Sequence, residues 1–139
     1  MKALSLLQPW ASLVVMGAKR LETRSWSTNY RGTLLIHASG GKAGSLLSSE
    51  PPFSRYINDF NNLPLGAIIG SVILTDIVKV EQLQLSEKTI NQLSLEERAF
   101  GDYTPGRYVW ILEEAVQFEK TVPIRGTLGL WEYSGEICI

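Results

Sequence analysis

Runs of alternating and continuous hydrophobic residues divide the chain into six or seven predicted strands. The strongest β pattern covers residues 66–82, and Gly70 within it indicates a β-bulge or a close approach of two backbones. Residues 33–38 form a second clear hydrophobic run. Shorter strands are predicted at residues 3–7, 20–26, 107–112, 115–120 and 128–133.

Helical spacing of hydrophobic residues predicts fewer and shorter helices. Pro9 suits the first turn of a helix over residues 9–16, and Gly17 suits its C-terminal end. Residues 39–65 are rich in Gly, Ser, Pro and Asn, so we expect the most variable part of the chain there, with one short helix around residues 53–60.

Residues 86–100 contain further helical pieces, for which Ser86 or Ser94 would serve as N-caps. The helices do not alternate strictly with the strands. The order therefore predicts an α+β fold: a small closed or nearly closed β-barrel of about six or seven strands with two or three short flanking helices. At 139 residues and 45% hydrophobic composition, we expect a single folded domain over residues 1–139.

Charge is distributed unevenly along the chain. The first 45 residues carry six basic side chains and one acidic one, whereas the rest carries seven basic and thirteen acidic ones. The net charge of −1 hides this polarity. Two outcomes remain open: the fold gathers the N-terminal cations into a local groove, or it mixes the two halves and removes the asymmetry.

Several chemical classes are excluded by missing motifs. The chain has no Gly-rich phosphate loop, no dinucleotide fingerprint and no nucleophile elbow. One histidine and one cysteine cannot form a zinc site of the usual kind, so we expect no metal and no cofactor. No hydrophobic run reaches the ~18 residues of a membrane helix. The single cysteine, Cys138, suits a reducing compartment, and we expect a cytoplasmic protein.

The stretch "GAKRLETRSW" carries the most chemistry. Strand alternation over residues 20–26 places Glu22, Arg24 and Trp26 on one face, with Lys19 at its entrance. A lysine beside a carboxylate can transfer protons, arginine binds phosphate, and an indole stacks on a base. A solvent-exposed strand with weak ion pairs explains the same pattern equally well.

Two further positions are of interest. Arg107 follows a tight Pro-Gly turn, which places it at the rim of a barrel, and Tyr108 follows on the same strand. His37 lies on the strand at residues 33–38, where it is either a hydrogen-bonded core histidine or part of the cavity that holds Glu22.

The motif residues also resemble a known family. Gly17, Lys19, Glu22 and Arg24 match the pattern Gly-x-Lys-x-x-Glu-x-Arg of ASCH domains, and residues 64–78, 101–112 and 122–133 are similar to the later strands of that family. The resemblance spans nearly the whole chain. It implies a PUA-like β-barrel with flanking helices, a binding cleft beside the motif, and binding of RNA or another nucleic acid, in places with transcription coactivation.

Some small bacterial proteins of similar fold are amidohydrolases that remove an acyl group from modified cytidine. Their pattern is Gly-x-Lys-x-x-Thr-x-Arg with a later glutamate. Here Glu22 replaces the threonine, and Asp76 and Glu81 are the candidates for the later glutamate. This difference favours binding over hydrolysis.

Three interpretations follow. In the first, the protein binds nucleic acid, preferably RNA, and its affinity falls steeply with salt; the contacts would come from Lys19, Arg20, Arg24, Trp26, Arg31 and Arg107, with His37, Tyr103 and Tyr108 as further cleft residues. In the second, it is a hydrolase of a modified nucleoside such as an N4-acylated cytidine, with Lys19 and Glu22 as catalytic residues. In the third, the motif braces the barrel and the chain binds a protein partner.

Overall fold

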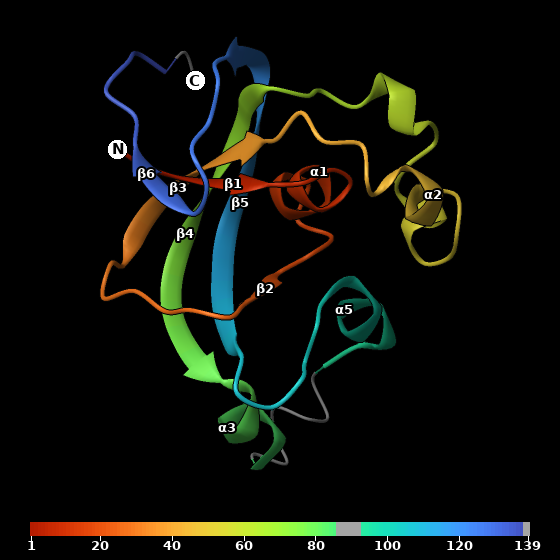
Figure 1. Cartoon of the computed structure of the whole chain (residues 1–139), viewed down its shortest axis with the longest axis vertical. Coiled ribbons are helices and arrows are strands. Elements are labelled where there is room, and N and C mark those ends of the chain that lie inside the picture. The colour runs from red at the N-terminus through yellow and green to blue at the C-terminus, as the bar shows by residue number, and fades with distance from the viewer. Residues whose placement is uncertain (86–92, 138–139) are drawn as a thin grey trace.

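A single six-stranded sheet organises the computed structural model, which describes residues 1–85 and 93–137. The strands are β1 (Lys2–Leu6), β2 (Leu21–Arg24), β3 (Gly32–Ala38), β4 (Ala67–Lys79), β5 (Tyr108–Pro123) and β6 (Leu130–Glu132). Their order in the sheet is β2-β5-β4-β3-β1-β6. The long strands β4 and β5 run side by side through the molecule, and the sheet curls so that β1 and β2 cross them (Figure 1).

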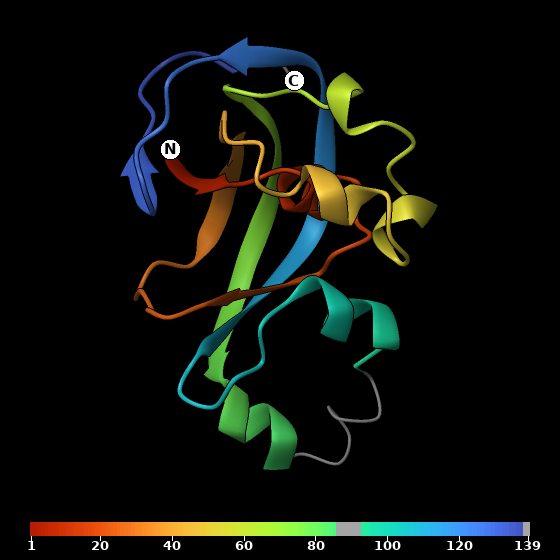
Figure 2. The same cartoon turned by 45° about the vertical axis from the view of Figure 1, so that its right-hand side comes forward.

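Short helices flank this curled sheet. They are α1 (Trp10–Val15), α2 (Ser45–Ser48), α3 (Val80–Leu85) and α5 (Leu95–Phe100), with two 3-10 turns, η1 (Phe53–Arg55) and η2 (Phe60–Asn62). Figure 2 shows α1 beside the concave side of the sheet, and α5 (teal) below α1 in this view. The α+β half-barrel with short helices confirms the predicted fold class. None of the helices in the described ranges is long and apolar enough to cross a membrane.

Helix α1 packs into the curl of the sheet because most of its residues are apolar and buried. Ala11, Val14 and Val15 are buried in one cluster with residues of β1, β3, β4 and β5. Gly17 then ends the helix with φ +81°, a conformation that glycine adopts without strain. The predicted helix over residues 9–16 and its glycine stop are therefore confirmed.

Strand β5 differs from expectation. The sequence predicts two strands, at residues 107–112 and 115–120, whereas the structure has one continuous strand. Residues 113–117, which cover the gap between the two predicted strands and the start of the second, are exposed. The pairing with β4 shifts register near this region. Glu114 adopts φ +50° there. This exposed irregularity interrupts the hydrophobic alternation without ending the strand.

Gly70 is the point where three elements meet. The register between β4 and β5 shifts between Ile68 and Gly70, as the bulge prediction requires. A Cβ at Gly70 would lie 2.3 Å from the carbonyl oxygen of Val116 and 2.6 Å from a methyl carbon of Val15. The close backbone approach predicted from the sequence is therefore also confirmed.

We expect Gly70→Ala to lower the free energy of unfolding by about 1–3 kcal/mol, because a backbone carbonyl cannot move aside as a side chain can. Urea denaturation measures this. Gly40→Ala is the matched control, since nothing lies within 4 Å of a Cβ there. Equal stability of the two variants would contradict the packing account of Gly70.

Two expectations cannot be compared with the structure. Ser86 as an N-cap and the single cysteine, Cys138, lie outside the described residues. The alternative cap is confirmed: the Ser94 side chain accepts a hydrogen bond from the backbone N–H of Glu97 at the start of α5. The segment at residues 39–65, expected to carry one short helix, contains α2, η1 and η2.

Candidate functional site

The motif lies on the edge strand β2, directly after α1. The backbone N–H of Lys19 donates to the carbonyl of Leu13 in the helix at 3.0 Å, which fixes the turn into the strand. Strand β2 pairs antiparallel with β5, so that Glu22 lies opposite Trp110 and Arg24 lies opposite Tyr108. The helix and two strands thus hold the motif in a defined position.

Lys19 is buried completely. Its side chain has 0% exposure, and its ammonium group donates a hydrogen bond to the carbonyl of Leu21. The ammonium nitrogen lies 3.8 Å from Oε1 of Glu22, whose side chain is 9% exposed. Because the ammonium is enclosed by protein, Lys19 has no surface on which a phosphate could sit in this conformation.

Glu22 connects Lys19 to Arg24. Its Oε1 atom accepts a hydrogen bond from the backbone N–H of Thr23 at 2.9 Å, and its Oε2 atom lies 3.8 Å from Nη1 of Arg24. That distance is too long for a hydrogen bond. Oε2 therefore keeps acceptor capacity for a ligand.

Arg24 and Trp26 extend the chain of contacts that begins with Lys19 and Glu22. The guanidinium carbon of Arg24 lies 5.6 Å from the ring centroid of Trp26, within the range of a cation–π contact. Trp26 in turn packs edge-on against Trp110, with the ring centroids 5.0 Å apart. The three side chains predicted on one strand face thus contact one another in sequence, and Trp26 supports Arg24 from the core side.

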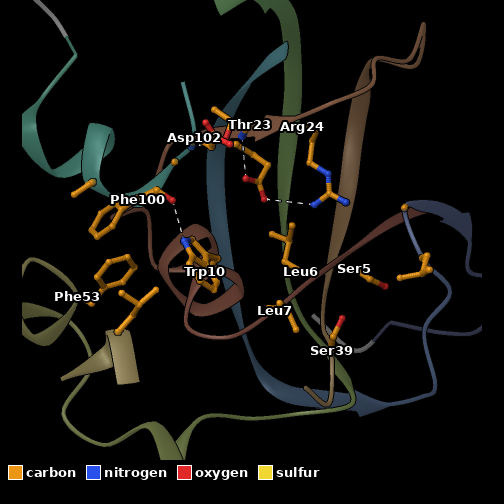
Figure 3. A pocket seen from close by; sticks show the side chains of 16 residues that line it. Ser5, Leu6, Leu7, Trp10, Thr23, Arg24, Ser39, Phe53, Phe100 and Asp102 are labelled. Carbon is orange, nitrogen blue, oxygen red and sulfur yellow. Dashed lines mark hydrogen bonds and ion pairs between the residues drawn. The ribbon is translucent and has the colours of Figure 1, made fainter. Parts of the chain in front are cut away.

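Glu22, Thr23 and Arg24 form one wall of a hollow with a volume of about 650 Å³, which we call the β2 hollow. Figure 3 shows these residues and the side chains that face them across the hollow. Ser5, Leu6 and Leu7 from the end of β1 also line it.

Aromatic residues make the opposite wall. Trp10, Phe53 and Phe100 come from α1, η1 and α5. Phe53 packs edge-on against Trp10 at 5.9 Å and against Phe100 at 5.1 Å between ring centroids. The indole N–H of Trp10 donates to the carbonyl of Phe100 at 2.8 Å and holds the wall together (Figure 3).

Asp102 adds a second carboxylate to the β2 hollow. Its backbone N–H donates to the Thr23 hydroxyl at 2.9 Å, which joins the loop after α5 to β2. Hydrogen bonds from the hydroxyl and backbone N–H of Thr104 lower the pKa of Asp102, so it is charged at neutral pH. Arg107 lies behind it, 3.6 Å from Oδ2 of Asp102, and donates to the carbonyl of Thr23.

The charges of the β2 hollow suit a ligand with N–H groups. Two carboxylates, Glu22 and Asp102, face one guanidinium, Arg24, among the described residues that line it. Carboxylates accept hydrogen bonds and repel phosphate. The interior therefore favours an uncharged ring with amino donors, and a phosphate would fit only near Arg24.

His37 lines a second hollow, of about 500 Å³, rather than the one that holds Glu22. Its Nε2 atom lies 2.7 Å from the carbonyl oxygen of Ile124, and its Nδ1 atom lies 3.2 Å from the Ser5 hydroxyl. Of the two roles expected from the sequence, His37 therefore has the first: it is a hydrogen-bonded strand histidine and not a residue of the cavity that holds Glu22. The two hollows are neighbours, since Ser5, Ser39 and Leu128 line both.

Other residues predicted for the site lie elsewhere. Asp76 and Glu81 are the two candidates for the later glutamate of the amidohydrolase pattern. Asp76 pairs with Arg31, with 3.6 Å between Oδ1 and Nη2. Glu81 accepts a hydrogen bond from the backbone N–H of Gly106. Arg20, Arg31, Tyr103, Tyr108, Asp76 and Glu81 are not among the lining residues of the β2 hollow. Tyr103 packs in the cluster of Val80, Leu83 and Val109, where burial raises the pKa of its hydroxyl.

The N-terminal excess of positive charge is largely paired by the fold. Four ion pairs account for this: Lys2 with Glu132, Lys19 with Glu22, Arg24 with Glu22, and Arg31 with Asp76. Lys2 and Arg31 pair with carboxylates from the acidic part of the chain, whereas Lys19 and Arg24 share Glu22, the one acidic residue of the N-terminal part.

Sequence reasoning missed the aromatic wall and Asp102. Trp10, Phe53 and Phe100 are far apart in the chain, and each has an ordinary hydrophobic context. Asp102 lies five residues before Arg107, in the segment "GDYTPGR". Its position near this predicted rim residue is the feature of the sequence that could have indicated it.

Glu97 fastens α5 to the motif. Its Oε2 atom accepts a hydrogen bond from the backbone N–H of Arg20 at 2.7 Å, and the residue is buried. Burial raises the pKa of this carboxyl. The folded state therefore holds the proton more tightly than the unfolded chain does, and stability declines as pH rises from about 4 through the raised value.

We expect Glu97→Gln to remove this decline, because the amide keeps an acceptor for Arg20 and carries no charge. The free energy of unfolding, measured by urea denaturation between about pH 4 and pH 8, should fall less for the variant than for the wild type. Glu119→Gln, at an exposed position of β5, is the control. Parallel pH profiles for wild type and Glu97→Gln would contradict the role given to this group.

Comparison with known proteins places these features in a family. The family model of the ASCH domain matches residues 4–125. Activating signal cointegrator 1 of Mus musculus and of Homo sapiens are each 31% identical to this chain over 140 residues. The alignments cover 96% of this chain and 22% of those proteins, so the chain spans about a fifth of the length of these relatives.

Solved structures agree on the fold. The crystal structure of ASCH from Zymomonas mobilis matches with a TM-score of 0.58 at 16% identity, covering 96% of this chain and 87% of that one. A single-substitution variant of that protein matches with a TM-score of 0.50 at 19% identity, covering 89% and 74%. With the family model matching most of its length, the chain belongs to the ASCH domain family.

Proposed function

We propose that this domain binds single-stranded nucleic acid, preferably RNA, and holds one unpaired base in the β2 hollow. One observation carries the proposal: the hollow has an aromatic wall and a polar wall that face each other. An unpaired base has the same two kinds of surface, since its faces are apolar and its edge carries hydrogen-bonding groups. ASCH domains are often nucleic-acid-binding, which is consistent with this assignment.

Size supports the same ligand class. The volume of about 650 Å³ lies within the roughly 300–1,000 Å³ of small-molecule sites. A base pair inside a duplex presents neither of its faces to such a hollow. The bound base must therefore come from a single strand, a loop or an unpaired end, which are the forms in which proteins read RNA sequence.

Each wall has a distinct task in this proposal. The base stacks against the indole of Trp10, which packs on the buried rings of Phe53 and Phe100, while Oε2 of Glu22 accepts a hydrogen bond from an amino group on its edge. Arg24 lies beside Glu22 and donates to the base or to its phosphate. Adenine, cytosine and guanine carry an exocyclic amino group, whereas uracil does not, so we expect uridine-only strands to bind weakest.

Titration of labelled single- and double-stranded RNA and DNA, followed by fluorescence anisotropy at low salt, tests the proposal. Single-stranded RNA should bind best. Arg24→Gln should weaken that binding about 10- to 100-fold, as expected for a lost hydrogen bond to a charged group. Lys120→Gln removes the same charge from an exposed site on β5 and should leave the affinity within about twofold.

Two results would overturn the proposal. One is a lack of binding to all four nucleic acids at about 50 mM salt, where electrostatic contacts are strong. The other is equal loss of affinity in Arg24→Gln and Lys120→Gln, which would indicate a general charge effect instead of a site at β2.

Salt dependence should be shallow, in contrast to the steep dependence expected from the sequence. Most of the predicted cations are paired or lie away from the β2 hollow. Each phosphate contact contributes about −0.7 to the slope of log affinity against log salt for a single strand, and Arg24 is the phosphate contact of this hollow, so the slope should be close to that value. A slope several times larger would require a broad cationic surface, which binding at the β2 hollow does not provide.

The amidohydrolase interpretation ranks second. Lys19, its expected base, lies buried behind Glu22 and is absent from the lining of the β2 hollow. Incubation with an N4-acylated cytidine and mass spectrometry of the product tests it directly. Release of the acyl group by the wild type, lost in Glu22→Gln while the variant remains folded, would place hydrolysis first.

A further inference from the structure

We propose that Leu128 separates two consecutive nucleotides of the bound strand, with one base in the β2 hollow and the next in the hollow beside His37. The minimal ligand is then a dinucleotide unit. This inference rests on the function proposed above, and it extends the site from one hollow to two.

Leu128 stands at the boundary of the two hollows. It lines both of them, and 94% of its surface is exposed. A leucine so exposed gains nothing from the fold, since its apolar surface remains in water. Proteins that bind nucleic acids insert apolar side chains of this kind between neighbouring bases, where the ligand covers the surface that water would otherwise contact.

The loop that carries Leu128 is fixed on both sides of it. The Ser5 hydroxyl donates to the carbonyl of Thr127 at 2.8 Å, and the Ser5 backbone N–H donates to the carbonyl of Gly129 at 3.3 Å. The Trp131 indole N–H donates to the same hydroxyl at 2.9 Å. A wedge must be held rigidly if it is to separate neighbouring bases. Two of these bonds tie its flanks to Ser5 of β1, and the third fixes the Ser5 hydroxyl to β6.

The second hollow has room and chemistry for the next nucleotide. Its volume of about 500 Å³ is within the range of ligand sites. His37, Arg125 and Thr127 are among the residues that line it. The Ser5 hydroxyl, which also lines it, is bonded to the carbonyl of Thr127. Gly126 lets the loop approach the imidazole, because a Cβ at this position would lie 2.5 Å from the His37 ring.

Arg125 supplies the cation for a phosphate. Unlike Arg24, Arg31 and Arg107, it forms no ion pair with any residue in the described part of the chain. It is exposed and lines the second hollow. An unpaired guanidinium next to a nucleotide-sized hollow is a suitable phosphate contact.

A chain-length series tests the inference. Adenylate and cytidylate mononucleotides, dinucleotides and tetranucleotides are titrated against the full chain, and binding is followed through the indole N–H signal of Trp10 in NMR spectra. The dinucleotide should bind about 5- to 100-fold tighter than the mononucleotide, the gain expected from one additional stacked base. The tetranucleotide should add little beyond the dinucleotide.

Leu128→Ser should reduce the dinucleotide gain to about threefold or less, when the gain is measured against the mononucleotide affinity of the same variant. Arg125→Gln should weaken the dinucleotide and spare the mononucleotide. Leu46→Ser is the matched control, because Leu46 is 83% exposed on α2 and lines neither hollow. All three positions are at the surface, so the variants are expected to fold.

The two proposals fail in different ways. If the dinucleotide binds no tighter than the mononucleotide, or if Leu128→Ser keeps the full gain, the wedge is refuted while a base in the β2 hollow stands. If no nucleotide of any length moves the Trp10 signal, the proposed function itself is refuted and the wedge with it.

Discussion

Replacing Lys19 by methionine is expected to lower the free energy of unfolding by about 3–5 kcal/mol, the usual cost of removing one partner of a buried ion pair. The substitution fills similar volume but leaves the Glu22 carboxylate without the ammonium at 3.8 Å, and it leaves the carbonyl of Leu21 without its donor. Domains of this size have about 5–15 kcal/mol of stability in total, so the variant would be close to unfolding.

Urea denaturation at neutral pH measures this loss, and Lys120→Met, at an exposed position, should change stability by less than about 0.5 kcal/mol. A double variant provides a sharper test. Lys19→Met combined with Glu22→Gln should be more stable than the sum of the single losses predicts, because the ammonium and the carboxylate of the buried pair are then both absent. Additive losses, or a cost below about 1 kcal/mol for Lys19→Met, would contradict a structural pairing of Lys19 with Glu22.

A combined change in both walls of the β2 hollow should nearly abolish nucleic-acid binding. Trp10→Leu removes a ring face but keeps an apolar side chain against Phe53, and Arg24→Gln removes the guanidinium. Stacking is worth about 1–3 kcal/mol per base, and a charged hydrogen bond is worth about 1.5–3 kcal/mol. Together, the two changes should weaken single-stranded RNA binding by about 100-fold or more.

Fluorescence anisotropy with the two single variants and the double variant checks this prediction, with thermal melting as the control for folding. The two residues come from different elements on opposite walls of the hollow, so their effects should multiply. If the double variant binds about as well as Arg24→Gln alone, the aromatic wall takes no part in binding.

Much of the local architecture could be predicted from the sequence. Pro9 and Gly17 delimit α1 because the first suits a helix start and the second adopts φ +81° at its end. Gly70 indicated a close backbone approach, and alternation placed Glu22, Arg24 and Trp26 in one contact series. These features depend on residues near one another in the chain.

Features that depend on distant segments could not be predicted. The complete burial of the Lys19 side chain is a property of the folded chain, which the motif itself does not encode. The aromatic wall unites residues from α1, η1 and α5, and the second hollow forms between β3 and the loop after β5. The sequence therefore identified the motif but could not separate its buried lysine from the carboxylate and guanidinium that line the β2 hollow.

We expect nucleic acid to enter the β2 hollow between its polar and aromatic walls. NMR spectra of the ¹⁵N-labelled protein, titrated with a short single-stranded RNA of mixed sequence, test it most directly, because four indole N–H groups report on different places. The indole N–H signal of Trp10 and the backbone amide signals of Thr23, Arg24 and Asp102 should shift most, while the signal of the buried Trp110 should change least. An unchanged Trp10 signal, with the largest shifts at Arg20 and Arg31, would contradict it.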